Sequence, residues 1–132
     1  MRSGLGPGSA SRVDSVVTPA MTAVLGGRQV HPVLATARMI EWMEWAGRRL
    51  ILPYLDAAED AVGYAITVRH LAPTPVGAAF WTIARFQGQD GRKIRAHVEA
   101  YSASGLVGDG EFVQVVLDRT ELKARFSEGA AP

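Results

Sequence analysis

The segment from Val33 to Leu55 constrains the fold of this chain more than any other part of the sequence. If residues 36–51 are wound at about 100° per residue, their apolar side chains gather on one face of a helix. These side chains are Met39, Ile40, Met43, Ala46, Gly47, Leu50 and Ile51. Pro53 cannot continue a helix, and it disfavours the helical conformation in the residue before it. The sequence therefore predicts one long helix that ends close to Pro53.

The opposite side of this helix has an unusual composition. It carries charged residues, but Trp45 lies near its centre and Trp42 at its margin. Large aromatic side chains that gather on an exposed face usually mark a contact surface. We therefore expect a further surface to cover the two tryptophans.

From Ala61 onwards the apolar pattern changes to a period of two, which is typical of strands. The first strand has on one face Val62, Tyr64, Ile66, Val68 and His70. Gly63 falls on its other face. Three more strands follow at residues 78–86, 93–101 and 106–117, with Gly-containing turns between them.

Two shorter features precede the helix. A short strand within residues 15–25 is broken at Pro19, and a loop runs from Gly26 to Pro32. Four later strands joined by short turns imply an antiparallel sheet. We expect an α+β fold in which a curved antiparallel sheet of about five strands packs against the long central helix. Such a sheet leaves one face and one edge uncovered, which favours a homodimer.

Length and composition limit the organisation of the chain. It has 132 residues, of which 48% are hydrophobic, which is enough for one domain with its own core. Residues 1–12 are rich in Gly and Ser and predict a disordered arm. We expect a single domain over residues 13–126 and a flexible tail over residues 127–132.

Charge and cysteine content exclude several classes of function. The net charge is +1 with acids and bases interspersed, so the sequence offers no basic surface for nucleic acid or for a membrane. Because there is no cysteine, disulfides, thiolate catalysis and thiolate metal sites are excluded. No secretory signal and no run of membrane-spanning length is found. We expect a soluble cytoplasmic protein.

Three polar residues lie where apolar neighbours are expected, namely Thr36, Glu44 and His70. On helix geometry Thr36 and Glu44 are about 12 Å apart along the axis, so they border one groove without touching. A carboxylate in such a groove can act as a base or nucleophile, and a histidine can transfer protons near neutral pH. Each residue also has a structural interpretation that is the more common outcome for a single residue. Thr36 would be an N-cap, Glu44 would pair with Arg48, and His70 would be a hydrogen-bonded core residue.

The other histidines and the late glycines carry no chemistry in this interpretation. No metal-ligand spacing involves any of the three histidines, and we interpret His31 and His97 as structural. Gly105, Gly108 and Gly110 look like a phosphate loop only superficially, since no helix clearly follows them. We interpret them as turn and strand-start glycines. The sequence therefore predicts no metal site.

Two segments together resemble a known family, the fluoroacetyl-coenzyme A thioesterase-like family of hotdog proteins. The segments are LATARMIEWMEWAGRRLILPYL and AVGYAITVRHLAPTPVG. The family pattern is an A-T dipeptide that opens the helix, a Glu eight residues later in an M-E-W-A context, a V-G or L-G pair, and a strand ending in H-x-A-x-T-P-x-G. The similarity runs from about Val13 to Leu122. It implies the hotdog fold, in which the sheet wraps the central helix.

The resemblance implies hydrolysis of an acyl thioester in a cleft at a dimer interface. It makes His70 the general base, Glu44 the group that activates water or attacks the carbonyl, and Thr36 a hydroxyl that orients the glutamate or polarises the carbonyl. Gly63 would permit close approach and lend an amide to the carbonyl oxygen. The partner would be an acyl-coenzyme A or an acyl carrier thioester, with no cofactor beyond the coenzyme A of the substrate. The chain would form a homodimer, with a tetramer as a further option.

Two departures from the family pattern bear on the substrate. The member that hydrolyses fluoroacetyl thioesters has a longer segment before the helix, with phenylalanines that form a lid, whereas GGRQVHPV here is short and has none. That enzyme also has a G-x-G-x-H-x-R run, where this chain reads GDGEFVQ and places Phe112 and Gln114 at the His and Arg positions. We therefore expect Phe112 and Gln114 to contact a small or medium acyl group other than fluoroacetyl.

Three functions stay open at this point. The intact set of Thr36, Glu44 and His70 favours an acyl-coenzyme A thioesterase. The altered Phe112 and Gln114 favour a non-catalytic hotdog dimer that binds an acyl thioester or another apolar ligand. A hotdog dehydratase or hydratase is the weakest of the three, because the sequence lacks the Asp-x-x-x-x-His arrangement of those enzymes.

Overall fold

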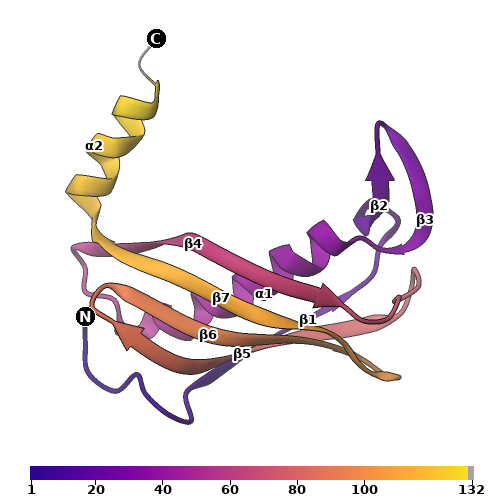
Figure 1. Cartoon of the computed structure of the whole chain (residues 1–132), viewed down its shortest axis with the longest axis horizontal. Coiled ribbons are helices and arrows are strands. Elements are labelled where there is room, and N and C mark those ends of the chain that lie inside the picture. The colour runs from indigo at the N-terminus through magenta and orange to yellow at the C-terminus, as the bar shows by residue number, and fades with distance from the viewer. Residues whose placement is uncertain (131–132) are drawn as a thin grey trace.

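The computed structural model describes residues 1–130, which form a sheet with one long helix along it (Figure 1). The elements in chain order are β1 (Ala10–Val16), the 3-10 helix η1 (Pro19–Met21), β2 (Thr22–Leu25), β3 (Arg28–Leu34), α1 (Thr36–Ile51), the 3-10 helix η2 (Leu52–Tyr54), β4 (Glu59–His70), β5 (Ala79–Asp90), β6 (Lys93–Ser102), β7 (Gly105–Asp118) and α2 (Arg119–Ala130). The β2–β3 hairpin lies at one end of the molecule, and α2 projects from the other.

The predicted long helix is present with the predicted bounds. α1 begins at Thr36 and ends at Ile51, and Pro53 follows inside η2. Its buried residues are Met39, Met43, Ala46, Gly47, Leu50 and Ile51. These positions recur with the helical period, so α1 presents one continuous apolar face to the sheet.

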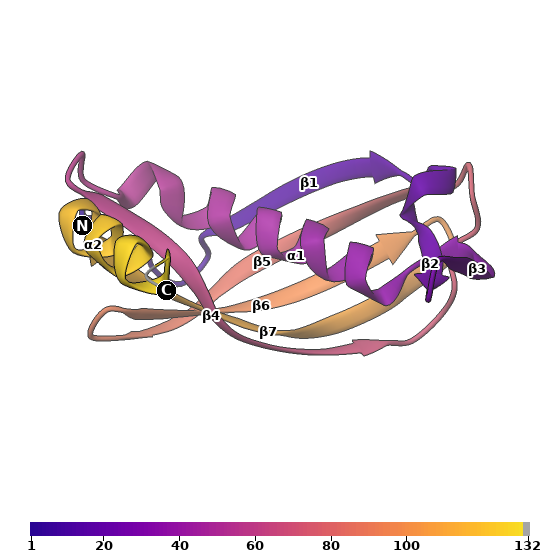
Figure 2. The ribbon, with the colours of Figure 1, turned by 90° about the horizontal axis from the view of Figure 1, so that it is seen from above.

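Five strands form one antiparallel sheet, and α1 lies along one of its faces (Figure 2). The strand order is β1-β5-β6-β7-β4. The four strands predicted after the helix are confirmed, but β4 pairs with β7 and not with β5, its neighbour in sequence. β4 is therefore an edge strand, and its outer edge has no strand partner within residues 1–130.

The core lies between α1 and the inward face of the sheet. β6 shows the alternation most clearly, because Ile94, Ala96, Val98, Ala100 and Ser102 are buried while the residues between them are partly exposed. Most of these side chains are small, which allows the helix to approach the middle of the sheet closely. Residues 1–130 include no helix that is long and apolar enough to cross a membrane.

The two tryptophans of α1 have different surroundings. Trp42 is partly buried, and its ring centroid lies 5.9 Å from that of Phe80 in β5. The expectation that a further surface covers both rings stays a prediction. Trp45 is 54% exposed in the single chain. One of the two aromatic rings therefore remains on the surface of the molecule.

The segment before α1 differs from its prediction. Residues 26–32 were expected to form a loop, but Gly26 and Gly27 make a tight turn and β3 pairs with β2. Both glycines have positive φ, of 60° and 77°, which is the conformation that a two-residue hairpin turn requires. β3 accommodates Pro32, because a proline is tolerated in a two-stranded ribbon where an edge needs no donor.

The two ends of the chain are more ordered than the sequence suggested. Where a disordered arm was expected over residues 1–12, β1 begins at Ala10 and the Arg2 N–H donates to the Tyr54 carbonyl at 2.7 Å. The amino group of Met1 lies 2.9 Å from the Asp56 carboxylate. These contacts use backbone and terminal groups, which composition does not reveal. At the other end, α2 overlaps the tail expected at residues 127–132, of which 131 and 132 lie outside the described residues.

Candidate active site

Thr36 and His70 meet where the first residue of α1 faces the last residue of β4. The Thr36 Oγ1 and His70 Nδ1 atoms are 2.8 Å apart, within hydrogen-bonding distance. The N-cap of α1 is Ala35, and no side chain caps the helix. The alternative interpretation of Thr36 as an N-cap is therefore wrong, because its hydroxyl is used for His70.

His70 is a half-buried histidine with one free ring nitrogen. Its Nε2 atom is buried and has no hydrogen-bond partner among the described residues. Burial lowers the pKa of His70 below its ordinary value of 6.5, and the backbone of Ala72 opposes this shift only in part. The ring is therefore neutral at neutral pH, and a neutral ring can accept a proton.

Glu44 lies two turns further along α1 and faces a groove between α1 and the sheet. The groove has a volume of about 290 Å³. It is lined by Glu41, Glu44, Trp45 and Arg48 of α1, by Ala61 and Gly63 of β4, and by Phe112 and Gln114 of β7. A Cβ atom added to Gly63 would lie 3.8 Å from Glu44 Oε2, so the carboxylate lies directly opposite the backbone of β4.

Arg48 does not pair with Glu44, although the sequence suggested that it would. Its guanidinium donates to the Ala61 carbonyl and to the Asp60 carboxylate, each at 3.0 Å. Burial raises the pKa of Asp60, but the Ala61 N–H and Arg48 lower it by more. Glu44 forms no hydrogen bond or ion pair within residues 1–130. Its carboxylate is therefore free for a ligand.

A β-bulge in β4 explains why Gly63 faces the helix. The pairing with β7 shifts between Gly63 and Ala65, which leaves Tyr64 as the extra residue. Before the bulge Gly63 pairs with Gln114, and after it Ile66 pairs with Phe112. The prediction that Gly63 and His70 lie on opposite faces of a regular strand is therefore wrong. The bulge shifts the alternation by one residue and brings both positions to the α1 side.

Phe112 and Gln114 form the bottom of the groove. They are only 3% and 2% exposed, so they lie beneath its opening. The Gln114 Nε2 atom donates to the Gly47 carbonyl at 2.9 Å, which fixes the side chain against α1. The two residues predicted to contact substrate are thus placed at the same groove as Glu44, but deep within it.

The six predicted site residues fall into two groups within one chain. Thr36 and His70 form a hydrogen-bonded pair at the N-terminus of α1, while Glu44 and Gly63 face each other across the groove. Neither Thr36 nor His70 lines that groove. The sequence had suggested that the predicted residues converge in one set. It did not reveal that Arg48 lines the groove and binds Asp60, because no local signal in the sequence indicates that pairing.

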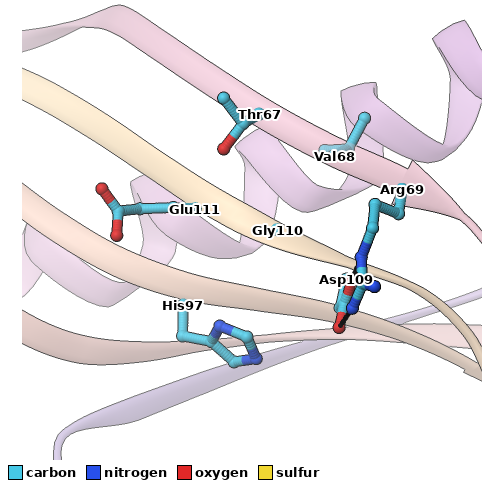
Figure 3. A pocket seen from close by; sticks show the side chains of 7 residues that line it. All are labelled: Thr67, Val68, Arg69, His97, Asp109, Gly110 and Glu111. Carbon is cyan, nitrogen blue, oxygen red and sulfur yellow. Dashed lines mark hydrogen bonds and ion pairs between the residues drawn. The ribbon is translucent and has the colours of Figure 1, made fainter.

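A second hollow lies on the face of the sheet turned away from α1 (Figure 3). Its volume is about 400 Å³, and its lining includes Thr67, His97 and Glu111. Arg69 and Asp109 form an ion pair at its margin, with Nη2 and Oδ2 2.9 Å apart. No cluster of residues within 1–130 is suited to hold a metal ion. This face is therefore polar and carries an ion pair at its margin.

The chain matches known proteins over nearly its whole length. The model of the fluoroacetyl-CoA-specific thioesterase family matches residues 17–120. The fluoroacetyl-CoA thioesterase of Streptantibioticus cattleyicolor is 30% identical, over 95% of this chain and 94% of that protein.

Solved structures agree with this match. A Thermus thermophilus protein described as a thioesterase superfamily member is 37% identical, with a TM-score of 0.91 over 95% of this chain and 93% of that chain. A hot-dog-like protein from Thermanaerovibrio acidaminovorans is 21% identical, with a TM-score of 0.88 over 96% of this chain and 93% of that chain, and it shows the fold. The α+β architecture is thus a hotdog-like fold, and the protein belongs to the fluoroacetyl-CoA-specific thioesterase family.

Proposed function

We propose that the protein hydrolyses a small or medium acyl-coenzyme A thioester in the groove that Glu44 and Gly63 face. The observation that carries this proposal is the unpaired Glu44 carboxylate, which lies opposite the backbone of a β-bulge in the edge strand. The family membership supplies the reaction class, since the curated relative is named a fluoroacetyl-CoA thioesterase. Because Phe112 and Gln114 stand where the family pattern has His and Arg, we do not expect the protein to be specific for fluoroacetyl-coenzyme A.

In the proposed reaction Glu44 takes a proton from water as the water oxygen attacks the thioester carbonyl. The C–S bond then breaks, and the coenzyme A thiolate leaves and takes up a proton. Direct attack by the Glu44 carboxylate is the other route, and it forms an anhydride that water then opens. In both routes the carbonyl oxygen becomes negative. The bulge interrupts the pairing with β7 between Gly63 and Ala65, and we assign to a backbone amide at this point the role of stabilising that charge.

We assign Thr36 and His70 to the same site, completed by a second copy of the chain. Within residues 1–130 the outer edge of β4 has no strand partner along its twelve residues. Tyr64 of β4 and Trp45 of the neighbouring helix are 61% and 54% exposed. An antiparallel pairing of two β4 edges about a twofold axis would be self-complementary. If that axis passes between Ile66 and Thr67, His70 of one copy lies opposite Gly63 of the other. The Thr36–His70 pair of one chain would then serve the groove of its partner.

Within that arrangement Thr36 Oγ1 and His70 Nδ1 share a hydrogen bond whose direction depends on the tautomer of the neutral ring. If Nδ1 accepts, His70 can act as the general base through Thr36 or through a bound water, alongside Glu44. If Nδ1–H donates, the hydroxyl hydrogen of Thr36 is free to orient the attacking group or to polarise the carbonyl. The assignment needs no cofactor other than the coenzyme A of the substrate.

A second candidate is binding of an acyl thioester without turnover. It is favoured by one observation. Where the family pattern has His and Arg, the bottom of this groove has the apolar ring of Phe112 and the amide of Gln114, which is bonded to the protein's own backbone. Several expectations stay predictions from the sequence. They are the thioester carrier, which is coenzyme A or an acyl carrier protein, a possible tetramer, a cytoplasmic location, and the absence of nucleic-acid and membrane partners.

The test is thiol release from a panel of short, branched, aromatic and long-chain acyl-coenzyme A esters. Wild type is compared with Glu44→Gln and His70→Ala, and Glu111→Gln, on the far face of the sheet, is the matched control. The proposal predicts that kcat falls by at least about a hundredfold in the first two variants and is unchanged in the third. Tight binding with no release from any ester would favour the binding protein instead.

A further inference from the structure

The ring of Phe112 lies at the bottom of the groove, between α1 and β4. Its Cδ2 atom would lie 2.5 Å from a Cβ atom on Gly47 of α1. Its Cε1 atom, on the other side of the ring, would lie 3.4 Å from a Cβ atom on Gly63 of β4. The ring is therefore wedged between two glycines, one from each wall of the groove.

The groove deepens toward this ring. Glu44 and Trp45 at its rim are exposed, whereas Phe112 and Gln114 beneath them are almost fully buried. An acyl group whose carbonyl carbon lies beside Glu44 and Gly63 can extend down onto Phe112. This path buries methylene groups, and each buried methylene favours binding.

The floor is also held in place. The Gln114 amide is bonded to the Gly47 carbonyl, so it closes the space beside the ring. A Cβ atom on Gly47 would lie 3.5 Å from Gln114 Nε2. The ring therefore fills the space beside Gly47 closely, whereas a side chain at Gly63 would meet it only at van der Waals distance.

We propose that Phe112, seated between Gly47 and Gly63, is the floor that limits this groove to short acyl chains. The inference rests on the proposed thioesterase function and adds to it the substrate class and the residue that sets it. It predicts that hydrolysis falls off as the acyl chain lengthens, and that a smaller residue at this position moves the limit to longer chains.

The test measures kcat/KM for acetyl-, butyryl-, hexanoyl- and octanoyl-coenzyme A. Phe112→Ala and the more conservative Phe112→Leu are compared with wild type, and Phe86→Ala is the control. Phe86 packs against the core from β5 and does not line the groove. Thermal unfolding of each variant shows whether it is folded. We expect Phe112→Ala to gain roughly 4-fold in relative kcat/KM for each added methylene that the new space accepts.

Two readouts separate a failure of this inference from a failure of the proposed function. If wild type releases no thiol, the thioesterase proposal is wrong. The role of Phe112 is then tested by calorimetry, which measures the affinity of each variant for thioether analogues of the same acyl-coenzyme A esters, because these analogues cannot be hydrolysed. The same shift toward longer chains is expected there. If folded Phe112→Ala and Phe112→Leu keep the wild-type chain-length profile in both readouts, Phe112 is not the floor.

Discussion

The Thr36 Oγ1 and His70 Nδ1 atoms lie 2.8 Å apart and join the first residue of α1 to the last residue of β4. The remaining ring nitrogen of His70 is buried and unpartnered within the described chain. Within residues 1–130, the Thr36 hydroxyl is the one side-chain hydrogen-bond partner of this histidine. Thr36 and His70 should act as one unit in any proton transfer.

Thr36→Val keeps the shape of the side chain but removes its hydroxyl. We expect kcat for the best acyl-coenzyme A ester to fall by roughly a hundredfold, because positioned proton transfer contributes about that much or more. Thr36→Ser keeps the hydroxyl and should retain most of the activity. Steady-state kinetics of the two variants check this. Equal activity of Thr36→Val and wild type would show that the hydrogen bond has no part in catalysis.

The lowered pKa of His70 makes folding stability depend on pH. A histidine whose pKa is lower in the folded state than its ordinary value of 6.5 binds protons more readily when unfolded. Its contribution is therefore complete above pH 6.5 and is lost as the pH falls toward the lowered value. Urea unfolding of wild type and His70→Gln at about pH 7.5 and about pH 5.5 measures this. Wild type should lose more free energy of unfolding on acidification than the variant, and parallel losses would contradict the argument.

Gly47 and Phe112 should be energetically coupled. Alanine is favoured over glycine in a helix by about 1 kcal/mol, but a Cβ atom at Gly47 would lie 2.5 Å from the Phe112 ring, and overpacking costs about 1–3 kcal/mol. Gly47→Ala should therefore destabilise wild type and stabilise the Phe112→Leu variant, in which the ring is absent. Urea unfolding of the four proteins gives the coupling free energy, which we expect to exceed about 1 kcal/mol. Additive effects would mean that the ring moves aside without cost.

These relationships show which parts of the site the sequence could reveal. The helical period fixed the bounds of α1 and placed Glu44 at the edge of its apolar face, because that information is local. The bulge at Tyr64 could not be predicted, since the alternation of apolar residues continues through it without a break. The extra residue is forced by pairing with β7, which lies about fifty residues later in the chain.

Contacts between residues far apart in the chain were likewise not predictable from the sequence. Thr36 and His70 were both selected, but their contact depends on where the end of an edge strand meets the start of a helix, and no spacing in the sequence encodes that. The interpretation of Gly108 and Gly110 as turn or strand-start residues is also incomplete. Both lie within β7, where a side chain at Gly108 would meet Met39 and one at Gly110 would meet the backbone of β4.

Gly110 should therefore be the least replaceable of these glycines. A Cβ atom there would overlap the carbonyl oxygen of Thr67 and lie 2.9 Å from the Cα atom of Val68. Backbone atoms of a paired strand cannot rotate away, so we expect Gly110→Ala to cost more than about 3 kcal/mol of unfolding free energy. Gly6→Ala, which meets nothing within 4 Å, is the control and should change stability little. A urea midpoint of Gly110→Ala equal to that of the control would show that β4 and β7 separate easily.

The proposed sharing of the site between two copies can be tested by complementation. Neither Glu44→Gln nor His70→Ala should be active as a homodimer. In a heterodimer of the two variants, one groove would combine the intact Glu44 of one chain with the intact Thr36–His70 pair of the other, while the second groove would lack both groups. The heterodimer, isolated with a different affinity tag on each chain, should therefore show about half of the wild-type kcat per dimer, because an isologous dimer has two equivalent sites. An inactive heterodimer, measured beside active wild type of the same dimeric mass, would instead mean that each site is built within a single chain.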